Sequence, residues 1–305
     1  MAAVDVPLGT ALQRRGQSNL GERVFEIATL ASLVIALGFL ILLIVQILQG
    51  ALPLLGDRGI GFVTDKLSPR VARTGLNQAI IGSLQIALIT VVVAFPLGIA
   101  TAIFLEEYAS DTWFTRIVDV NIRNLAGVPS IVFGLLGFAI FVRLLEPVTG
   151  GSTALAGGLT LALLALPIVV ITSAEAIRAV PLSLREGGFG LGGTRWQITR
   201  KLVLPNALPG ILTGTILALA RAIGETAPLL VIGAATFLTI DASLLGGLTD
   251  RFTALPVIVF HWSKQPSREF VDAAAPAAIL VLMLFTLTLN AVAIWLRNRY
   301  EKRKA

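Results

Sequence analysis

The sequence has 305 residues, of which 55% are hydrophobic and 14% are charged, whereas about 25% of residues are charged in a soluble domain. It has no cysteine and one histidine, His261, which excludes disulfides, thiolate chemistry and multi-histidine metal sites. The net charge of +6 is not arranged as a basic stripe interleaved with aromatic residues, so a nucleic-acid partner is excluded. The composition predicts an all-α, polytopic membrane protein.

The N-terminal 23 residues are polar and predict a cytoplasmic lead. The stretch from Ile27 to Gly56 contains no charged residue. About 20 apolar residues cross a bilayer, and a signal peptide has an apolar core of roughly 7–15, so this stretch predicts a membrane span. A polar loop follows to Arg73, and we assign residues 1–75 to the lead, the first transmembrane helix and an outer loop.

Five further apolar stretches predict the remaining spans of a six-helix membrane protein. They run from Thr74 to Leu105, Asn124 to Val142, Pro147 to Ala174, Leu202 to Ile240, and Ala273 to Leu296. Residues 76–296 thus form a predicted core with five transmembrane helices, and residues 297–305 form a basic cytoplasmic tail.

Two segments between spans have a pattern typical of membrane surfaces. From Asp111 to Arg123, apolar residues recur with helical spacing, which predicts a short amphipathic helix. The loop 241–272 carries Phe252, Phe260 and Trp262. Because aromatic residues are enriched where membrane meets water, we expect these three at the interface.

The distribution of Lys and Arg predicts the orientation. With the N-terminus inside, the cytoplasmic segments hold 15 basic residues and the outer loops hold 7. Basic residues accumulate on the cytoplasmic side of membrane proteins, so both termini are expected in the cytoplasm. The loop 181–205 then also lies in the cytoplasm.

The loop 181–205 has a clear local plan. Ser183 with Glu186, and Thr194 with Gln197, have the spacing of capping boxes and predict two short helices. Gly192 lies between them, where a left-handed residue ends a helix at no steric cost. Basic residues are predicted on one face of this helix–turn–helix and apolar residues on another.

The sequence contains no nucleotide-binding motif. None of its five lysines follows a glycine, so the pattern Gly-x-x-x-x-Gly-Lys-Ser/Thr is absent. We therefore expect no ATP, magnesium or other cofactor in this chain, and no enzymatic activity of its own.

The fifth predicted span contains two charges, Arg221 and Glu225. An arginine at the centre of a span costs about 2.5–3.5 kcal/mol. The two residues are four apart and lie within the arc swept by small residues, which are Gly210, Gly214, Ala218 and Ala222. Two interpretations stay open: an ion pair that fixes helix packing, or an anion pathway in which Arg221 attracts an oxyanion.

A resemblance emerges from the loop. Glu186-Gly187-Gly188, then Gly192, then Leu202-Val203-Leu204-Pro205 resembles the EAA loop of ABC-importer permeases. Two alanines of that pattern are glycines here, and each glycine destabilises the helix by roughly 1 kcal/mol relative to alanine. The isoleucine of the pattern is a leucine here. The resemblance implies a loop that docks on an ATPase through Arg185, Glu186, Gly187, Gly188, Gly192, Leu202, Leu204 and Pro205.

A more specific resemblance covers residues 76–300. The segments ARAIGETAPLLVIGA (220–234) and AGVPSIVFGLLG (126–137), and more loosely 252–262, resemble PstA-type permeases of bacterial phosphate importers. The resemblance implies the MetI-type permease fold in the bacterial cytoplasmic membrane. It also implies a heterodimer with a sister permease, two copies of a cytoplasmic ATPase that binds ATP and magnesium, and an extracytoplasmic phosphate-binding protein.

Alternative functions remain. The nearest alternative is the closely related sister permease of phosphate systems (PstC-type), and permeases for molybdate or sulfate come next. An ion-coupled secondary carrier has no use for a docking loop and usually shows repeated halves, and a membrane scaffold leaves Arg221 and Glu225 unexplained.

Overall fold

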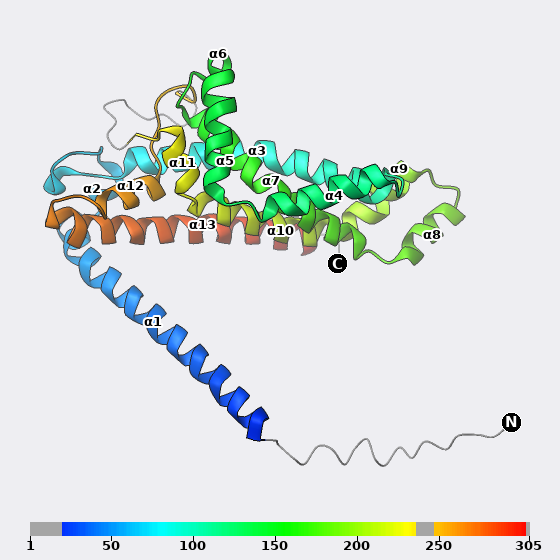
Figure 1. The fold of residues 1–305 in the computed structure, drawn as a ribbon, viewed down its shortest axis with the longest axis horizontal. Helices are drawn as coiled ribbons and strands as arrows, with labels where there is room; N and C mark the ends of the chain where they lie inside the picture. The colour runs from blue at the N-terminus through cyan, green and yellow to red at the C-terminus, as the bar shows by residue number, and fades with distance from the viewer. Residues whose placement is uncertain (1–19, 236–246, 303–305) are drawn as a thin grey trace. The chain divides into compact units, whose positions relative to one another are not determined.

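The computed structural model describes residues 20–235 and 247–302, and its described elements are helices (Figure 1). The chain divides into two units, one ending at Gln49 and one beginning at Gly50. The helix α1 (Leu20–Arg58) starts in the first unit and is long and apolar enough to span a membrane, as predicted. Most of the predicted polar lead lies outside the described residues.

Four long helices form the body of the second unit. They are α3 (Asn77–Ile103), α7 (Ala154–Arg178), α10 (Leu204–Gly224) and α13 (Ala275–Lys302). Helix α7 packs against α3 and α10, and α10 packs against α13, so the four run side by side (Figure 1). Each belongs to a stretch long and apolar enough to cross a bilayer, which confirms the second, fourth and sixth predicted spans and places a span within the fifth.

Shorter elements connect these helices. They are α2 (Gly61–Thr64), the 3₁₀ turn η2 (Val71–Arg73), α4 (Trp113–Ala126), α5 (Ser130–Gly137), α6 (Glu146–Thr149), α8 (Leu182–Gly190), α9 (Arg195–Ile198), α11 (Ala227–Ile232) and α12 (Leu255–Trp262). Four π-helical turns complete the set: η3 (Phe104–Tyr108), η4 (Phe138–Leu144), η5 (Thr199–Val203) and η6 (Phe270–Ala274). Helices α8 and α9 lie at one end of the bundle, and α2 and α12 lie at the other (Figure 1).

The third crossing is a bent pair of helices. Glu106, at the end of α3, contacts Arg178, at the end of α7, so both helices end on the same side. Helix α7 must therefore begin on the opposite side, and the chain between Glu106 and Ala154 has to cross. Between them lie α4 and the helix formed by α5 and η4, set at 104° to each other, which together are long and apolar enough for one broken span. Helix α4 is the amphipathic helix predicted from Asp111 to Arg123, and the span predicted to begin at Asn124 begins instead at Ser130.

The fifth span is also broken, which corrects the continuous stretch predicted from Leu202 to Ile240. Helix α10 ends at Gly224, and Glu225 is extended, with ψ 121°. Pro228 lacks an N–H and its ring crowds the carbonyl of Gly224, which favours a break here, although α3 and α7 continue through Pro96 and Pro167. The short helix α11 follows, and residues 236–240 lie outside the described part of the chain.

The described part of the predicted loop, residues 247–272, folds into the protein, so the prediction of interfacial aromatic residues is wrong for two of the three. Phe252 and Trp262 are 3% and 1% exposed, and only Phe260 reaches the surface. Trp262 packs against Phe62 and Phe270, with ring centroids 6.3 and 5.5 Å away. Helix α12 is therefore a buried element of the core. Residues 241–246 are not described.

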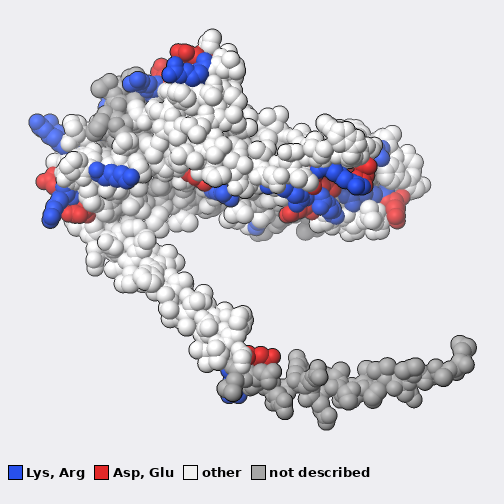
Figure 2. Space-filling view, viewed as in Figure 1, with Lys and Arg blue, Asp and Glu red and all other residues white. Residues whose placement is uncertain are grey.

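Charged side chains gather at the two ends of the bundle and near the tip of the projection that carries α6, and most of the surface between these groups is uncharged (Figure 2). Such a surface is typical of one that faces lipid or another membrane helix. The end with α8 and α9 carries both signs of charge.

Candidate functional site

The two helices of the loop 181–205 meet in a Schellman motif. Gly192 has a φ of +79°, and its N–H donates to the carbonyl oxygen of Phe189 at 2.9 Å. The N–H of Gly193 donates to the carbonyl oxygen of Gly188 at 3.1 Å. These two bonds satisfy carbonyls that the end of α8 would otherwise leave open. The predicted left-handed joint at Gly192 is confirmed.

One of the two predicted capping boxes is present. The Thr194 hydroxyl accepts from the Gln197 N–H at 3.3 Å, and the Gln197 side chain accepts from the Thr194 N–H at 3.0 Å. The box predicted at Ser183 and Glu186 is wrong, because α8 begins earlier: Pro181 is its N-cap, with no side-chain capping bond. Proline suits a helix start, since its fixed φ is near-helical and its missing N–H needs no partner.

The apolar residues of the loop divide into two sets. An exposed set, which we call the apolar patch, consists of Leu182, Leu184, Phe189, Leu191 and Trp196. Leu202 and Leu204, predicted for the same face, instead pack partly buried against the core, and Pro205 lies in the first turn of α10. The apolar patch is the part of the loop available to a partner.

Glu186, Gly187 and Gly188 occupy different environments. Glu186 is exposed, and a Cβ added at Gly187 would meet nothing within 4 Å. A Cβ at Gly188 would lie 2.9 Å from side-chain atoms of both Ile198 and Leu202. The small residue at 188 thus lets α8 lie close to the second half of the loop.

Arg185 faces inward rather than toward a partner. Its guanidinium donates to the carbonyl oxygens of Val180 and Ile177, at 2.6 and 2.9 Å. It also forms an ion pair with Glu107 at 2.9 Å, where the two side chains are 16% and 8% exposed. Sequence reasoning missed Glu107, because no periodicity links residues 78 positions apart. Arg185 therefore caps the end of α7 and ties α8 to the end of α3.

Arg221 and Glu225 lie where the fifth span breaks. The Arg221 Nε and the Glu225 Oε1 are 4.0 Å apart, and the side chains are 58% and 24% exposed. This separation is longer than a hydrogen bond, so the pair is loose. Arg221 occupies the last turn of α10, where the helix dipole favours a cation.

The small residues of α10 do face another helix, as predicted. Added Cβ atoms at Gly210 and Gly214 would lie 2.8 and 2.3 Å from the side chains of Ala176 and Thr172 on α7. Ala218 and Ala222 are each 1% exposed. The close packing of α10 on α7 leaves the Arg221 side chain largely accessible rather than enclosed.

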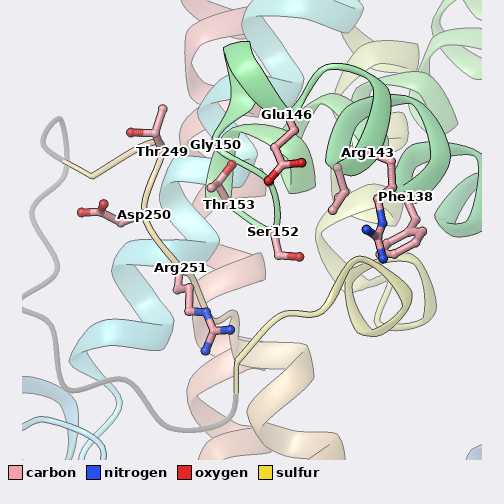
Figure 3. Close-up of a pocket in the computed structure, with 11 residues that line it drawn as sticks. Phe138, Arg143, Glu146, Gly150, Ser152, Thr153, Thr249, Asp250 and Arg251 are labelled. Atoms are coloured by element: carbon pink, nitrogen blue, oxygen red, sulfur yellow. The ribbon is translucent and has the colours of Figure 1, made fainter.

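A polar cavity of about 480 Å³ lies between η4, α6, the turn before α7 and residues 249–251 (Figure 3). It is thus at the start of α7, whose other end leads into the loop 181–205. Its lining includes Arg143, Glu146, Ser152, Asp250 and Arg251. Arg143 lies in η4, with its guanidinium 5.3 Å from the centre of the Phe138 ring. The cavity carries charges of both signs. Within residues 20–235 and 247–302, no cluster of His, Cys, Asp and Glu has the makings of a metal site.

A bundle of membrane helices with a compact helical loop at one end is the MetI-type fold of ABC-importer permeases. A chain of the MetNI methionine ABC transporter superposes with a TM-score of 0.57 at 18% identity, covering 74% of this chain and 95% of that one. A chain of a bacterial alginate ABC transporter, in complex with an alginate-bound periplasmic protein, superposes with a TM-score of 0.63 at 16% identity, covering 94% and 96%.

The sequence places the chain in a family. Residues 71–305 match the family described as binding-protein-dependent transport system inner membrane component, and the chain belongs to that family. It is 37% identical over 237 residues to the phosphate transport system permease protein PstA of Yersinia pestis, covering 77% of this chain and 76% of the relative. It is 34% identical over 222 residues to PstA 1 of Mycobacterium tuberculosis H37Rv, covering 72% and 69%. It is also 32% identical to the probable ABC transporter permease YqgI of Bacillus subtilis, covering 79% and 84%.

Proposed function

We propose that this chain is the membrane-spanning subunit of an ATP-driven importer of inorganic phosphate. The phosphate permeases named above support this proposal, because they match about three quarters of the chain at 34–37% identity. The observation that carries it is the accessible guanidinium of Arg221 at the break in the fifth span, 58% exposed between stretches of apolar helix. A charged side chain within a membrane span costs free energy, so its presence there indicates a functional role.

The pathway chemistry follows from the properties of a guanidinium. Its planar fork of N–H donors matches two oxygens of a tetrahedral oxyanion. Glu225 lies 4.0 Å away and balances the charge when no anion is bound. Because the contact is loose, an incoming anion displaces it without breaking a short hydrogen bond. Arg221 is the attracting group, and Glu225 is its counter-ion.

The loop 181–205 is the proposed contact with the ATPase. Its apolar patch is exposed, and the Schellman motif and the Thr194 capping box fix the two helices that carry it. The chain lacks a nucleotide-binding motif, so the proposal assigns ATP and magnesium to a cytoplasmic ATPase dimer. The loop and both termini then face the cytoplasm of a bacterial cell.

Two further partners complete the proposed importer. A homologous sister permease forms the heterodimer, covering membrane-facing surfaces of this chain. An extracytoplasmic phosphate-binding protein delivers the substrate to the end of the bundle where the polar cavity opens. Structural relatives of this fold include a transporter in complex with a periplasmic protein, which supports this arrangement.

The test is uptake of radiolabelled phosphate in cells that lack this chain and are complemented with it. Unlabelled phosphate should compete strongly, and sulfate and molybdate weakly. The complex purified through this chain should contain an ATPase and a second permease. Strong competition by sulfate or molybdate would reassign the substrate, and a complex without an ATPase would contradict the importer itself.

A further inference from the structure

The end of α3 contacts the loop 181–205 through three consecutive residues of the π-helical turn η3. Glu106 forms an ion pair with Arg178, just before the loop. Glu107 forms an ion pair with Arg185, on α8. The guanidinium carbon of Arg195, on α9, lies 6.0 Å from the centre of the Tyr108 ring. The turn therefore touches the chain before the loop and both helices within it.

The contact of Glu107 with Arg185 is the more buried of the two ion pairs. The Nε and Nη2 atoms of Arg185 donate to one carboxylate oxygen of Glu107, at 3.2 and 2.9 Å. The same guanidinium holds the carbonyls of Ile177 and Val180 at the end of α7. Two N–H donors that converge on one carboxylate oxygen fix the orientation of the guanidinium as well as its distance. One side chain thus joins α3, α7 and α8.

The burial of this pair determines what happens when α8 is displaced. Glu107 is 8% exposed and Arg185 is 16% exposed. Separating them would leave two charges largely buried without partners, which is strongly unfavourable. Moving the ends of α3 and α7 together with α8 keeps every bond. The second course has the lower free energy.

The loop has an internal structure that favours movement as one body. Its helices are joined by the Schellman motif, and α8 lies against Ile198 and Leu202 of the second half. A π-helical turn is a local irregularity that recurs at functional positions in helices. Here it presents three successive side chains to three separate partners.

We propose that η3 is the element through which movement of the loop 181–205 reaches the transmembrane helices, with Glu107 as the positioning residue. This inference rests on the proposed function, because it presumes that an ATPase moves the loop. It assigns Arg185 to force transmission within the chain and leaves contact with the ATPase to the apolar patch. Glu107 and Arg185 touch neither substrate nor nucleotide.

The experiment uses the complete importer in proteoliposomes, with its ATPase, sister permease and binding protein. The readout is the number of phosphate ions imported per ATP hydrolysed. Glu107→Gln should keep the ATPase bound and active and lower this ratio about tenfold. The matched control is Asp111→Asn, which breaks the exposed ion pair with Arg116 at the start of α4 and leaves the contacts of η3 intact. The control should keep the wild-type ratio, and a wild-type ratio in Glu107→Gln would overturn the proposal.

A second measurement leaves the buried pair intact, in case Glu107→Gln fails to assemble. Cysteines replace Tyr108 and Arg195 in this cysteine-free chain, within a complex that has no other accessible cysteine, and a short bis-maleimide links them. If turn and loop move together, the linked complex imports at the rate of the unlinked one. If the link stops transport, the loop slides over η3 and the proposal is wrong.

The two proposals fail in different ways. A wild-type complex that imports no phosphate contradicts the substrate assignment alone. The ratio and the linkage are then measured with whichever oxyanion the complex imports. A wild-type complex that imports phosphate, beside a Glu107→Gln complex with an unchanged ratio, contradicts only the role of η3.

Discussion

The carbonyl oxygen of Thr253 lies 2.0 Å from the position that a Cβ of residue 82 would occupy. The backbone before α12 therefore rests directly on α3, and the next residue, Ser83, accepts a hydrogen bond from the Leu255 N–H at 2.8 Å. Gly82→Ala should force the two segments apart. We expect a loss of about 1–3 kcal/mol, as for other overpacked cores.

The measurement is thermal unfolding of the purified protein in detergent. Gly187→Ala is the matched control, because position 187 is helical and open and alanine favours a helix by about 1 kcal/mol. The control should melt at or above the wild-type temperature, and Gly82→Ala below it. Equal melting temperatures for the two variants would show that the chain before α12 is not seated on α3 as described.

The two sites that share the capping-box spacing give the next prediction. Thr194→Ala removes the bond to the Gln197 N–H and should destabilise the start of α9 by about 1 kcal/mol. Ser183→Ala should have little effect, because Pro181 and not Ser183 begins α8. Amide hydrogen exchange in the peptide covering the loop 181–205 reports the difference. Faster exchange around α8 in Ser183→Ala would show that Ser183 does cap this helix and would contradict the structure.

The number and order of the membrane spans could be predicted from the sequence, because hydrophobic length is a property of each stretch alone. The breaks were harder to predict. Pro228 is visible in the sequence, but α3 and α7 also contain prolines and are not broken by them. The sequence therefore does not show that α10 ends at Gly224. Hydropathy also cannot distinguish an aromatic residue at an interface from one in a core, so Trp262 was misplaced.

The candidate site shows the same division. Gly192 and the Thr194 capping box depend on neighbouring residues, and both were predicted correctly. The ion pair of Glu107 with Arg185 joins distant parts of the chain, and a single sequence contains no signal for it. Arg221 could be singled out from the sequence because an arginine within a membrane span costs free energy. That cost does not reveal which groups surround the side chain or how exposed it is.

His261 gives a prediction that depends on pH. Burial lowers the pKa of its imidazole below the usual 6.5, because the charged form loses solvation. The unfolded chain therefore binds a proton more readily than the folded chain. The free energy of unfolding should fall as the pH drops from about 7 through the lowered pKa, and it should be independent of this group above 7.

His261 is the only histidine in the sequence, so its titration can be followed without overlap by NMR of the selectively labelled protein without a polyhistidine tag. We expect a midpoint below 6.5. In His261→Gln, the decline in thermal stability between pH 7 and the midpoint should be smaller than in the wild type. A midpoint above 6.5 would mean that α12 exposes this side chain.

The last prediction separates the two interpretations of Arg221 and Glu225. The pair is loose, and its arginine is mostly exposed. An exposed ion pair contributes about 0–1 kcal/mol, so removing either charge should leave assembly of the importer nearly unchanged. If the pair were the structural lock of the fifth span, single variants would assemble poorly and the double variant would recover. Arg221→Gln, Glu225→Gln and the double variant therefore decide between them.

We expect the double variant to assemble and to lose phosphate uptake by about 10–100-fold, the value of one hydrogen bond to a charged group. Arg221→Lys keeps the charge but not the planar fork, so uptake should be intermediate. Uptake is divided by the amount of assembled complex. Arg116→Gln, which removes an exposed arginine on α4, is the control for charge alone and should transport normally. Normal uptake in the double variant would assign the pair to packing, because an anion pathway cannot lose its only guanidinium at the break and remain unaffected.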